Sequence, residues 1–405
     1  MKREAGILTK TISVALLGMA IVAAPAFAKQ HPPAKSFNRI AVFPVFENSD
    51  IAYETVAEIV DVSKDGNTLI YTDSQLEVAG LIDITDPGNP KAAGTVALAG
   101  EPTSVAVAGG YALVAVNTSA DFVNTSGELV VIEVTTKEVI TTLPLGGQPD
   151  SVAVSPDGRY AAVVIENERD EDLGDGAPPQ RPSGFLVIVD LMGDPTSWTT
   201  RNVGFDGVAD MFPEDAEPEY VDINKANMAV VTFQESNHIA IVNLVSGKVV
   251  KDFPAGAVDL AEIDTLENDL IELNSSLTAV PREPDGVKAI PSRYLLVAAS
   301  EEDSRDDGFR AVVNIYQLDE AAPSYPAVMS ADRDDGTPIP WGALSGLAAD
   351  PAHSNTVYTI HDSFYRESRV YAMDVSKSPA VITSETVLRD SMGKLAAIDP
   401  GMVNG

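Results

Sequence analysis

The sequence predicts an all-β protein, a β-propeller of about six four-stranded blades, and leaves open whether the ring is incompletely closed. Two short apolar runs joined by a tight turn recur along the chain, clearly in residues 102–116 and 149–165. This pattern is typical of β-hairpins. The copies start 45 to 69 residues apart, and helical periodicity is scarce. Four short strands per repeat of this length are the signature of a propeller blade.

The first 28 residues have the features of a secretory signal peptide. Basic residues precede an apolar run at 12–24, and Ala26-Phe27-Ala28 supplies small residues at a cleavage site, which we expect after Ala28. Thirteen apolar residues form a helix of only about 20 Å, which is too short to serve as a membrane anchor. We therefore expect a periplasmic or secreted protein without a transmembrane segment.

Residues 39–342 contain the propeller repeats, and residues 343–405 form a last, truncated blade. One apolar residue marks the first strand of each copy: Val60, Val105, Val152, Val221, Val287 and Leu347. The apolar run at 39–46 is predicted to be a strand that pairs with the last blade and closes the ring, which protects open edges. A β-sandwich is the alternative fold, but the recurring hairpin motif favours the propeller.

One segment departs from the strand pattern. Ile263, Leu266, Leu270, Ile271 and Leu273 recur at helical spacing. We predict a short surface helix at 260–273, inserted between two repeats.

The composition excludes some partners. Lys and Arg number 27 against 60 Asp and Glu, a net charge of −33, and removal of residues 1–28 leaves 24 − 59 = −35. Such a charge repels nucleic acids and anionic membrane surfaces. The chain has no cysteine, so its stability depends on its core rather than on disulfides. We expect a monomer.

Polar residues gather at one end of the predicted blades. Acidic or amide residues fall at the ends of second strands and in the loops between blades, which open on the same face of a propeller. These residues are Asp73, Asn117, Glu166, Gln234, Glu301 and His361 at strand ends, and Glu101, Asp150, Glu217, Glu219, Glu283 and Asp285 in the loops. Solvated acidic loops and a cation site both fit this pattern.

Calcium is the cofactor that this chemistry suggests. Two acidic insertions, 166–175 and 301–307, supply hard oxygen ligands at short spacing, although neither matches an EF-hand loop. The candidate metal ligands are Glu166, Glu168, Asp170, Glu235, Glu301, Asp303 and Asp306.

Familiar catalytic motifs are absent from the sequence. It contains no G-x-S-x-G elbow, P-loop or H-E-x-x-H motif. His361 and Asp362 form the best titratable cluster, but adjacent strand residues point to opposite faces and do not make a triad alone. Arg366 and Arg369 nearby are candidates for binding an anion.

Two sets of motifs resemble known families. Residues 345–351, 357–363 and 369–375 resemble the opening of the phytase-like domain of bacterial "esterase-like activity of phytase" proteins. Residues 148–160 and 185–191 resemble YVTN-type and choice-of-anchor propeller repeats. The resemblance covers about residues 40–405. Proteins of this kind usually continue beyond a segment like 395–400 and carry further blades between segments like 281–287 and 290–297, so this chain looks shortened.

Two functions remain open from the sequence. The resemblance implies a calcium-assisted phosphoesterase acting on a small phosphate ester, with Glu166, Glu235, Glu301 and Asp362 on the metal side and Arg366 and Arg369 on the phosphate. The residues alone slightly favour a non-catalytic propeller that binds a protein, a polysaccharide or a metal ion in the cell envelope, because the sequence shows no complete catalytic constellation.

Overall fold

The computed structural model describes most of the predicted propeller. The described residues are 40–170, 172–174, 176, 178–263, 274–290, 295–300, 312–317, 328–341, 344–361 and 369–388. The chain separates into residues 1–38 and 39–405, and every described residue lies in the second unit. The predicted signal peptide and its cleavage site therefore lie outside the described residues.

The first two sheets are four-stranded antiparallel meanders. The first contains β1 (Val60–Val62), β2 (Thr68–Asp73), β3 (Val78–Asp83) and β4 (Lys91–Ala97). The second contains β5 (Glu101–Ala108), β6 (Tyr111–Asn117), β7 (Gly127–Glu133) and β8 (Val139–Pro144). Each strand pairs with the next one along the chain, as the hairpin pattern predicts.

The next two sheets repeat this order. The third contains β9 (Pro149–Val154), β10 (Tyr160–Ile165), β11 (Phe185–Asp190) and β12 (Thr199–Gly204), with a short 3-10 helix η2 (Pro195–Ser197) before β12. The fourth contains β13 (Pro218–Ile223), β14 (Met228–Phe233), β15 (His238–Asn243) and β16 (Lys248–Pro254). Both sheets have the same four-strand order as the first two. The longest connection between strands within these sheets is the loop from β10 to β11.

The second half is less regular. A hairpin of β17 (Ala257–Ile263) and β18 (Ser275–Pro281) precedes a three-stranded sheet of β19 (Pro284–Ile290), β20 (Leu295–Ser300) and β21 (Val312–Gln317). The last sheet contains β23 (Leu344–Ala349), β24 (Thr356–His361), β25 (Arg369–Asp374) and β26 (Ala380–Val387), and β22 (Val328–Ser330) pairs in parallel with β26. Within the described residues, five sheets thus have at least four strands.

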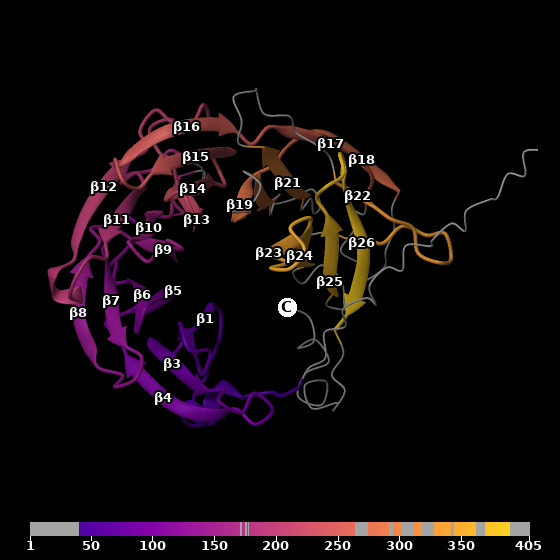
Figure 1. Ribbon diagram of the computed structural model, residues 1–405. Helices are drawn as coiled ribbons and strands as arrows, with labels where there is room; N and C mark the ends of the chain where they lie inside the picture. Colours follow the sequence, from indigo (N-terminus) through magenta and orange to yellow (C-terminus); the bar gives the residue numbers. More distant parts are fainter. Residues whose placement is uncertain are drawn as a thin grey trace, which may run out of the picture. The chain divides into compact units, whose positions relative to one another are not determined.

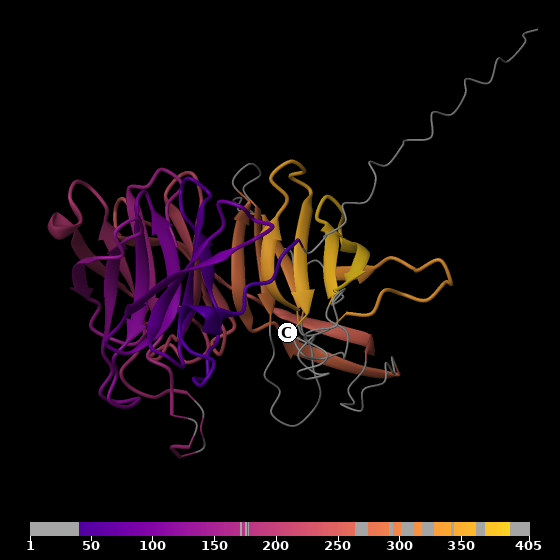
Figure 2. The ribbon, with the colours of Figure 1, turned by 90° about the horizontal axis from the view of Figure 1, so that it is seen from below.

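The sheets are arranged as the blades of a β-propeller, which confirms the predicted fold class. Figure 1 shows the innermost strands β1, β5, β9, β13, β19 and β23 facing a common centre, and each contains one of the predicted marker residues. Seen from the side, the connecting loops gather at two opposite ends of the sheets (Figure 2). No strand of the described residues joins the first sheet to the last, so the propeller is not closed by hydrogen bonds.

The hydrophobic core lies between neighbouring blades. One cluster joins the third and fourth blades through Leu186, Phe205 and Phe233, all fully buried, and the rings of Phe205 and Phe233 meet edge to face at 4.8 Å. Similar clusters lie between the first and second blades and between the second and third. Successive residues of a strand point to opposite faces of a blade. Because both faces carry apolar residues, each blade packs against the blades on either side.

Hydrogen bonds also link the innermost strands of neighbouring blades. The side chains of Asp61, Ser104 and Asp222 accept backbone N–H groups of Val107, Val152 and Ala289 at 2.7, 3.2 and 2.8 Å. In each case the acceptor lies on one innermost strand and the donor on the next. These bonds satisfy backbone groups that face the channel rather than a strand partner.

Thr232 makes a further link between blades and provides a test of its strength. Its hydroxyl is buried, accepts the N–H of Tyr220 at 3.1 Å and donates to the carbonyl of Asp285 at 2.7 Å. Thr232→Val is expected to lower the free energy of unfolding by about 1–3 kcal/mol, because both backbone groups lose their partner. Urea unfolding measures this, with Thr232→Ser as the control that keeps the hydroxyl; equal stability of the Val and wild-type proteins would contradict it.

Two predicted elements are wrong. The closing strand predicted at 39–46 does not form in its described residues, 40–46. Instead, Val45–Asn48 form a 3-10 helix, η1, and Asn48 binds the first blade through Tyr71, the Leu81 carbonyl and the Gly94 N–H. Residues 260–263, predicted to begin a helix, belong to β17, where Leu260 pairs with Leu277 and Ile263 with Ser275. Cross-strand pairing with β18 outweighs the local helical spacing here. The rest of that predicted helix, 264–273, lies outside the described residues.

Candidate functional site

A pocket of about 510 Å³ lies at one end of the second, third and fourth blades. It collects residues from three innermost strands, β5, β9 and β13, and from the loops that follow β6 and β10. Six of its twelve lining residues are acidic, and none is basic. The lining residues are Glu101, Thr103, Asn117, Ser119, Asp121, Phe122, Gln148, Pro149, Asp150, Glu166, Glu168 and Glu219.

The repeat explains why these residues meet. Glu101 begins β5, Asp150 and Glu219 are the second residues of β9 and β13, and Glu166 directly follows β10. The starts of first strands and the ends of second strands lie at the same end of an antiparallel blade. The prediction that such residues converge on one rim is confirmed for these residues.

The carboxylates of this pocket are hard to ionise together. Burial raises the pKa of Asp150 to about 7, with further contributions from the charges of Asp285 and Glu168. Burial also raises the pKa values of Glu166 and Glu219 well above their usual range, and the charge of Asp150 adds to both shifts. Asp150, Glu166 and Glu219 make no side-chain hydrogen bond or ion pair within the described part of the chain. Like charges close together without partners favour either protons or cations.

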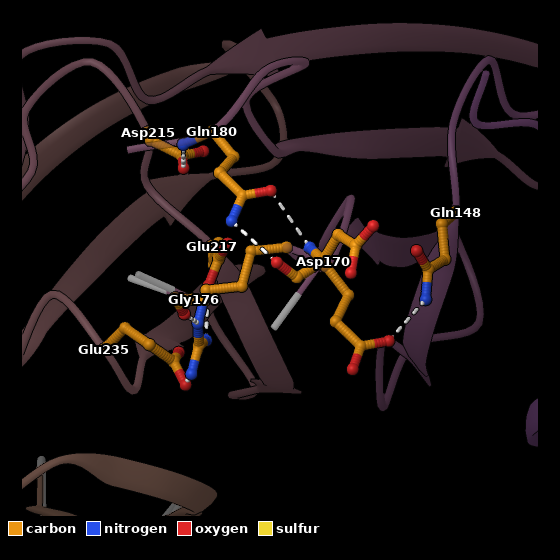
Figure 3. A network of polar contacts seen from close by, with 9 residues as sticks. Gln148, Asp170, Gly176, Gln180, Asp215, Glu217 and Glu235 are labelled. Atoms are coloured by element: carbon orange, nitrogen blue, oxygen red, sulfur yellow. Dashed lines mark hydrogen bonds and ion pairs between the residues drawn. The ribbon is translucent and has the colours of Figure 1, made fainter. Parts of the chain in front are cut away.

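The loop of residues 166–184 is anchored beside this pocket by an arginine. Arg169 Nη1 lies 3.1 Å from Glu217 Oε2 and 2.9 Å from Glu235 Oε1, while its Nε donates to the carbonyl of Gly176 at 3.0 Å. Figure 3 shows Glu217, Glu235 and Gly176 around this point. One guanidinium therefore connects the loop after β10 to the loop before β13 and to the turn after β14.

Gln180 fixes the far side of the same loop. Its side chain accepts from the N–H of Asp170 at 3.0 Å and donates to the carbonyl of Asp170 at 2.9 Å, and its own N–H donates to Asp215 Oδ2 at 2.6 Å. Gln148 donates to Glu168 at 3.2 Å from the third blade (Figure 3). The loop is thus held by side chains on three separate segments.

The carboxylates around Arg169 are only partly satisfied. Asp215 and Glu217 are each 1% exposed, and Asp215 Oδ1, Glu217 Oε1 and Glu235 Oε2 are buried without a hydrogen-bond partner in the described residues. Burial raises the pKa of Glu217 to about 8, and the charges of Glu235 and Asp215 add to the shift. One arginine therefore compensates less negative charge than this region contains.

The predicted metal ligands lie in different parts of the protein. Glu166 and Glu168 line the acidic pocket, and Glu235 binds Arg169. Asp170 lies in the 166–184 loop, where its carboxylate accepts the N–H of Asp172 at 3.0 Å. Glu301, Asp303 and Asp306 lie outside the described residues. Among the described residues, no three acidic or histidine side chains are arranged to hold a metal ion.

The predicted catalytic and anion-binding residues belong to the last blade. His361 ends β24, and Asp362 and Arg366 lie outside the described residues. Arg369 begins β25 and is largely buried, with its Nε 3.0 Å from Glu385 Oε2. The structure therefore brings Glu166 and Glu168 together, while the roles assigned to the last blade stay predictions.

Sequence reasoning missed two residues of the site. Arg169 lies within the acidic insertion 166–175, and its partners lie 48 and 66 residues away along the chain, so the local sequence does not reveal its role. Phe122, 40% exposed at the edge of the pocket, follows Asp121 in the loop after β6. An aromatic residue directly after Asp121, in a loop rich in Ser, Thr and Asn, was the available signal for it.

Comparison with known proteins identifies the family. The model of the choice-of-anchor I domain matches residues 58–335, which is more than half of the chain. The chain belongs to the choice-of-anchor I domain family. None of the curated proteins matches the chain in sequence.

One solved structure supports the fold of this choice-of-anchor I domain. Hydrazine synthase from Kuenenia stuttgartiensis is similar with a TM-score of 0.53 and 16% identity, over 79% of this chain and 77% of that one. A functionally unknown protein from Desulfotomaculum acetoxidans is similar with a TM-score of 0.49 and 12% identity, over 84% of this chain and 90% of that one. At such identities the first likeness supports the fold alone.

Membership of a choice-of-anchor family indicates a cell-surface or secreted protein. In the part of the chain that the structure describes, no helix has the length and apolar character needed to cross a membrane.

Proposed function

We propose that this choice-of-anchor I domain is an extracytoplasmic binding propeller that takes a positively charged ligand in its acidic pocket. The convergence of six acidic and no basic residues on one pocket of about 510 Å³ carries this proposal. A cleft lined by charges of one sign concentrates ligands of the opposite sign. A bound cation would also relieve the repulsion among Asp150, Glu166 and Glu219.

The location proposed for this activity is the periplasm or the cell exterior. The basic start, apolar run and small residues of 1–28 support export, together with the choice-of-anchor family. An envelope protein or polysaccharide is the partner class, and the charge of −33 argues against nucleic acid. We propose a monomer.

Calcium is one candidate for the cation. The carboxylates of the pocket and the amide oxygens of Asn117 and Gln148 are hard ligands of the type that Ca²⁺ prefers. The described residues offer no preformed cage, however, because no three acidic or histidine side chains are arranged around one point. Calcium would therefore bind only if the loops adjusted or water completed its shell.

Thermal unfolding with added cations tests the proposal. We expect CaCl₂ or spermidine to raise the melting temperature of the protein more than NaCl at equal ionic strength, because a ligand bound only to the folded state stabilises it. Glu219→Gln should reduce this extra rise by at least half. Glu138→Gln, which removes an exposed charge between β7 and β8 at the opposite end of the blade, should leave the rise unchanged. Equal effects of all three salts would mean charge screening alone and would contradict the proposal.

A calcium-assisted phosphoesterase is the second candidate, favoured by the likeness of residues 345–375 to phytase-like domains. In this proposal Glu166, Glu235, Glu301 and Asp362 face the metal and Arg366 and Arg369 bind phosphate, with His361 as a titratable group nearby. Release of phosphate from p-nitrophenyl phosphate, dependent on CaCl₂ and lost in Glu301→Ala or Asp362→Ala, is the expected result. Activity that is unchanged in both variants would refute these assignments.

A further inference from the structure

We infer that the acidic pocket binds an organic cation through a guanidinium or primary ammonium group, with Phe122 in contact with the ligand. The inference rests on the proposed function and narrows its ligand class. It depends on the chemistry of the pocket wall, on an internal guanidinium beside the pocket, and on a buried polar group that has no partner.

The pocket suits an organic cation better than a bare metal ion. Its volume of about 510 Å³ far exceeds that of one ion, and no three acidic or histidine side chains of the described residues are arranged to hold a metal. Phe122 lies at its edge with 40% of its surface exposed. The face of an aromatic ring attracts guanidinium and ammonium groups. The alkyl chain that carries such a group can also pack against the ring.

The same end of the propeller already binds a guanidinium within the chain. Arg169 lies between Glu217 and Glu235 at 3.1 and 2.9 Å, in a group of carboxylates whose charges also act on Glu166. Charge-assisted hydrogen bonds of this kind match the fork of a guanidinium. The pocket repeats the same residue types, but none of its lining residues is basic.

Unpartnered polar groups independently indicate a missing ligand. Thr103 lines the pocket, and its hydroxyl oxygen is buried without a hydrogen-bond partner in the described residues. Beside the pocket, Glu217, which binds Arg169 and is only 1% exposed, also keeps one carboxylate oxygen without a hydrogen-bond partner in the described residues. Buried polar atoms are normally satisfied, so such atoms suggest that a donor is absent. A guanidinium or ammonium group consists only of donors.

Binding of a fluorescein-labelled hexaarginine peptide and of spermidine tests the inference. The measurement is made on the protein lacking residues 1–28, at pH 8.5 and 150 mM NaCl, where more carboxylates are ionised. We expect Glu166→Gln to weaken binding at least tenfold and Phe122→Ala two- to fivefold. Glu138→Gln removes the same charge far from the pocket and should change the affinity by less than twofold. Binding of the peptide but not of spermidine would identify a basic polypeptide as the ligand. Binding of spermidine but not of the peptide would identify a free polyamine.

Three other outcomes overturn the inference. Equal weakening by Glu166→Gln and Glu138→Gln would show attraction by net charge rather than binding in the pocket. Calcium stabilisation without binding of either organic cation would leave the proposed function standing and remove this ligand class. No response to any cation would remove both.

Discussion

Arg169→Met is expected to lower the free energy of unfolding by about 3–5 kcal/mol at pH 8.5. Arg169 is 11% exposed and is the cation that Glu217 and Glu235 share. Removing one partner of a buried ion pair leaves the other charge uncompensated, which costs more than the pair itself contributes. Glu217 is 1% exposed and cannot regain hydration without displacing the 166–184 loop.

The cost of this substitution should depend on pH. The pKa of Glu217, already about 8 because of burial, must rise further when Arg169 is absent. At pH 6 the carboxyl is then neutral and the loss of stability becomes smaller. Urea unfolding at pH 6 and pH 8.5 measures the difference.

Matched variants separate this effect from a general loss of charge. Arg181 also lies in the 166–184 loop, but its contact with Asp206 is 3.9 Å long and both side chains are more than half exposed. Arg181→Met is therefore expected to change the stability by less than about 0.5 kcal/mol. Arg169→Met combined with Glu217→Gln should recover much of the loss. A single Arg169→Met variant as stable as wild type at pH 8.5 would show that the ion pairs do not hold the loop.

The blades could be predicted from the sequence because their determinants are local. Val105, Val152 and Val221 lie on innermost strands as expected, since apolar alternation and a tight turn specify a hairpin whatever surrounds it. The wrong elements are those that depend on distant partners. Residues 39–46 have the pattern of a strand in isolation, but Asn48, just after them, binds β3 and β4 of the first blade instead. Leu260–Ile263 has helical spacing, yet its residues pair with β18 residues that lie 12 to 17 positions further along the chain.

The candidate site divides in the same way. The convergence of Glu101, Asp150 and Glu219 follows from the position of each in its repeat, so strand order was enough to predict it. The role of Arg169 depends on how an irregular 19-residue loop of the third blade folds against the fourth blade, which no repeat specifies. Repetition thus predicted where charge accumulates, while the partner of that charge could be found only in the structure.

The protein is expected to become less stable as the pH rises from 5.5 to 9. The pKa of Asp150 rises from 3.8 to about 7 on folding and that of Glu217 from 4.5 to about 8, both chiefly through burial. At a pH between the unfolded-state and the folded-state pKa of each group, the folded state binds more protons than the unfolded state, so a rise in pH favours unfolding. The stability from these groups is fully present below about pH 4 and is lost as the pH passes through 7 and 8.

The size of this effect is several kcal/mol at most. One unit of pKa shift corresponds to about 1.4 kcal/mol, and contact with solvent and counter-ions lowers the total, so we expect a loss of about 2–4 kcal/mol over this range. Carboxyls with lowered pKa values, such as Asp157 beside Asn227, act in the opposite direction but only below about pH 4. They do not cancel the trend in the measured window.

Urea midpoints at pH 5.5, 7 and 9 test this dependence, with Asp150→Asn/Glu217→Gln as the decisive variant. Its stability should vary with pH by less than half as much as that of the wild-type protein, because two of the raised carboxyls no longer titrate. The cations that bind the acidic pocket should flatten the wild-type curve in the same way, since they stabilise the ionised carboxylates that high pH produces. A wild-type stability that is constant or rises with pH would contradict this prediction. It would mean that other groups of the folded protein already compensate these carboxylates, and their repulsion would then no longer support cation binding in the pocket.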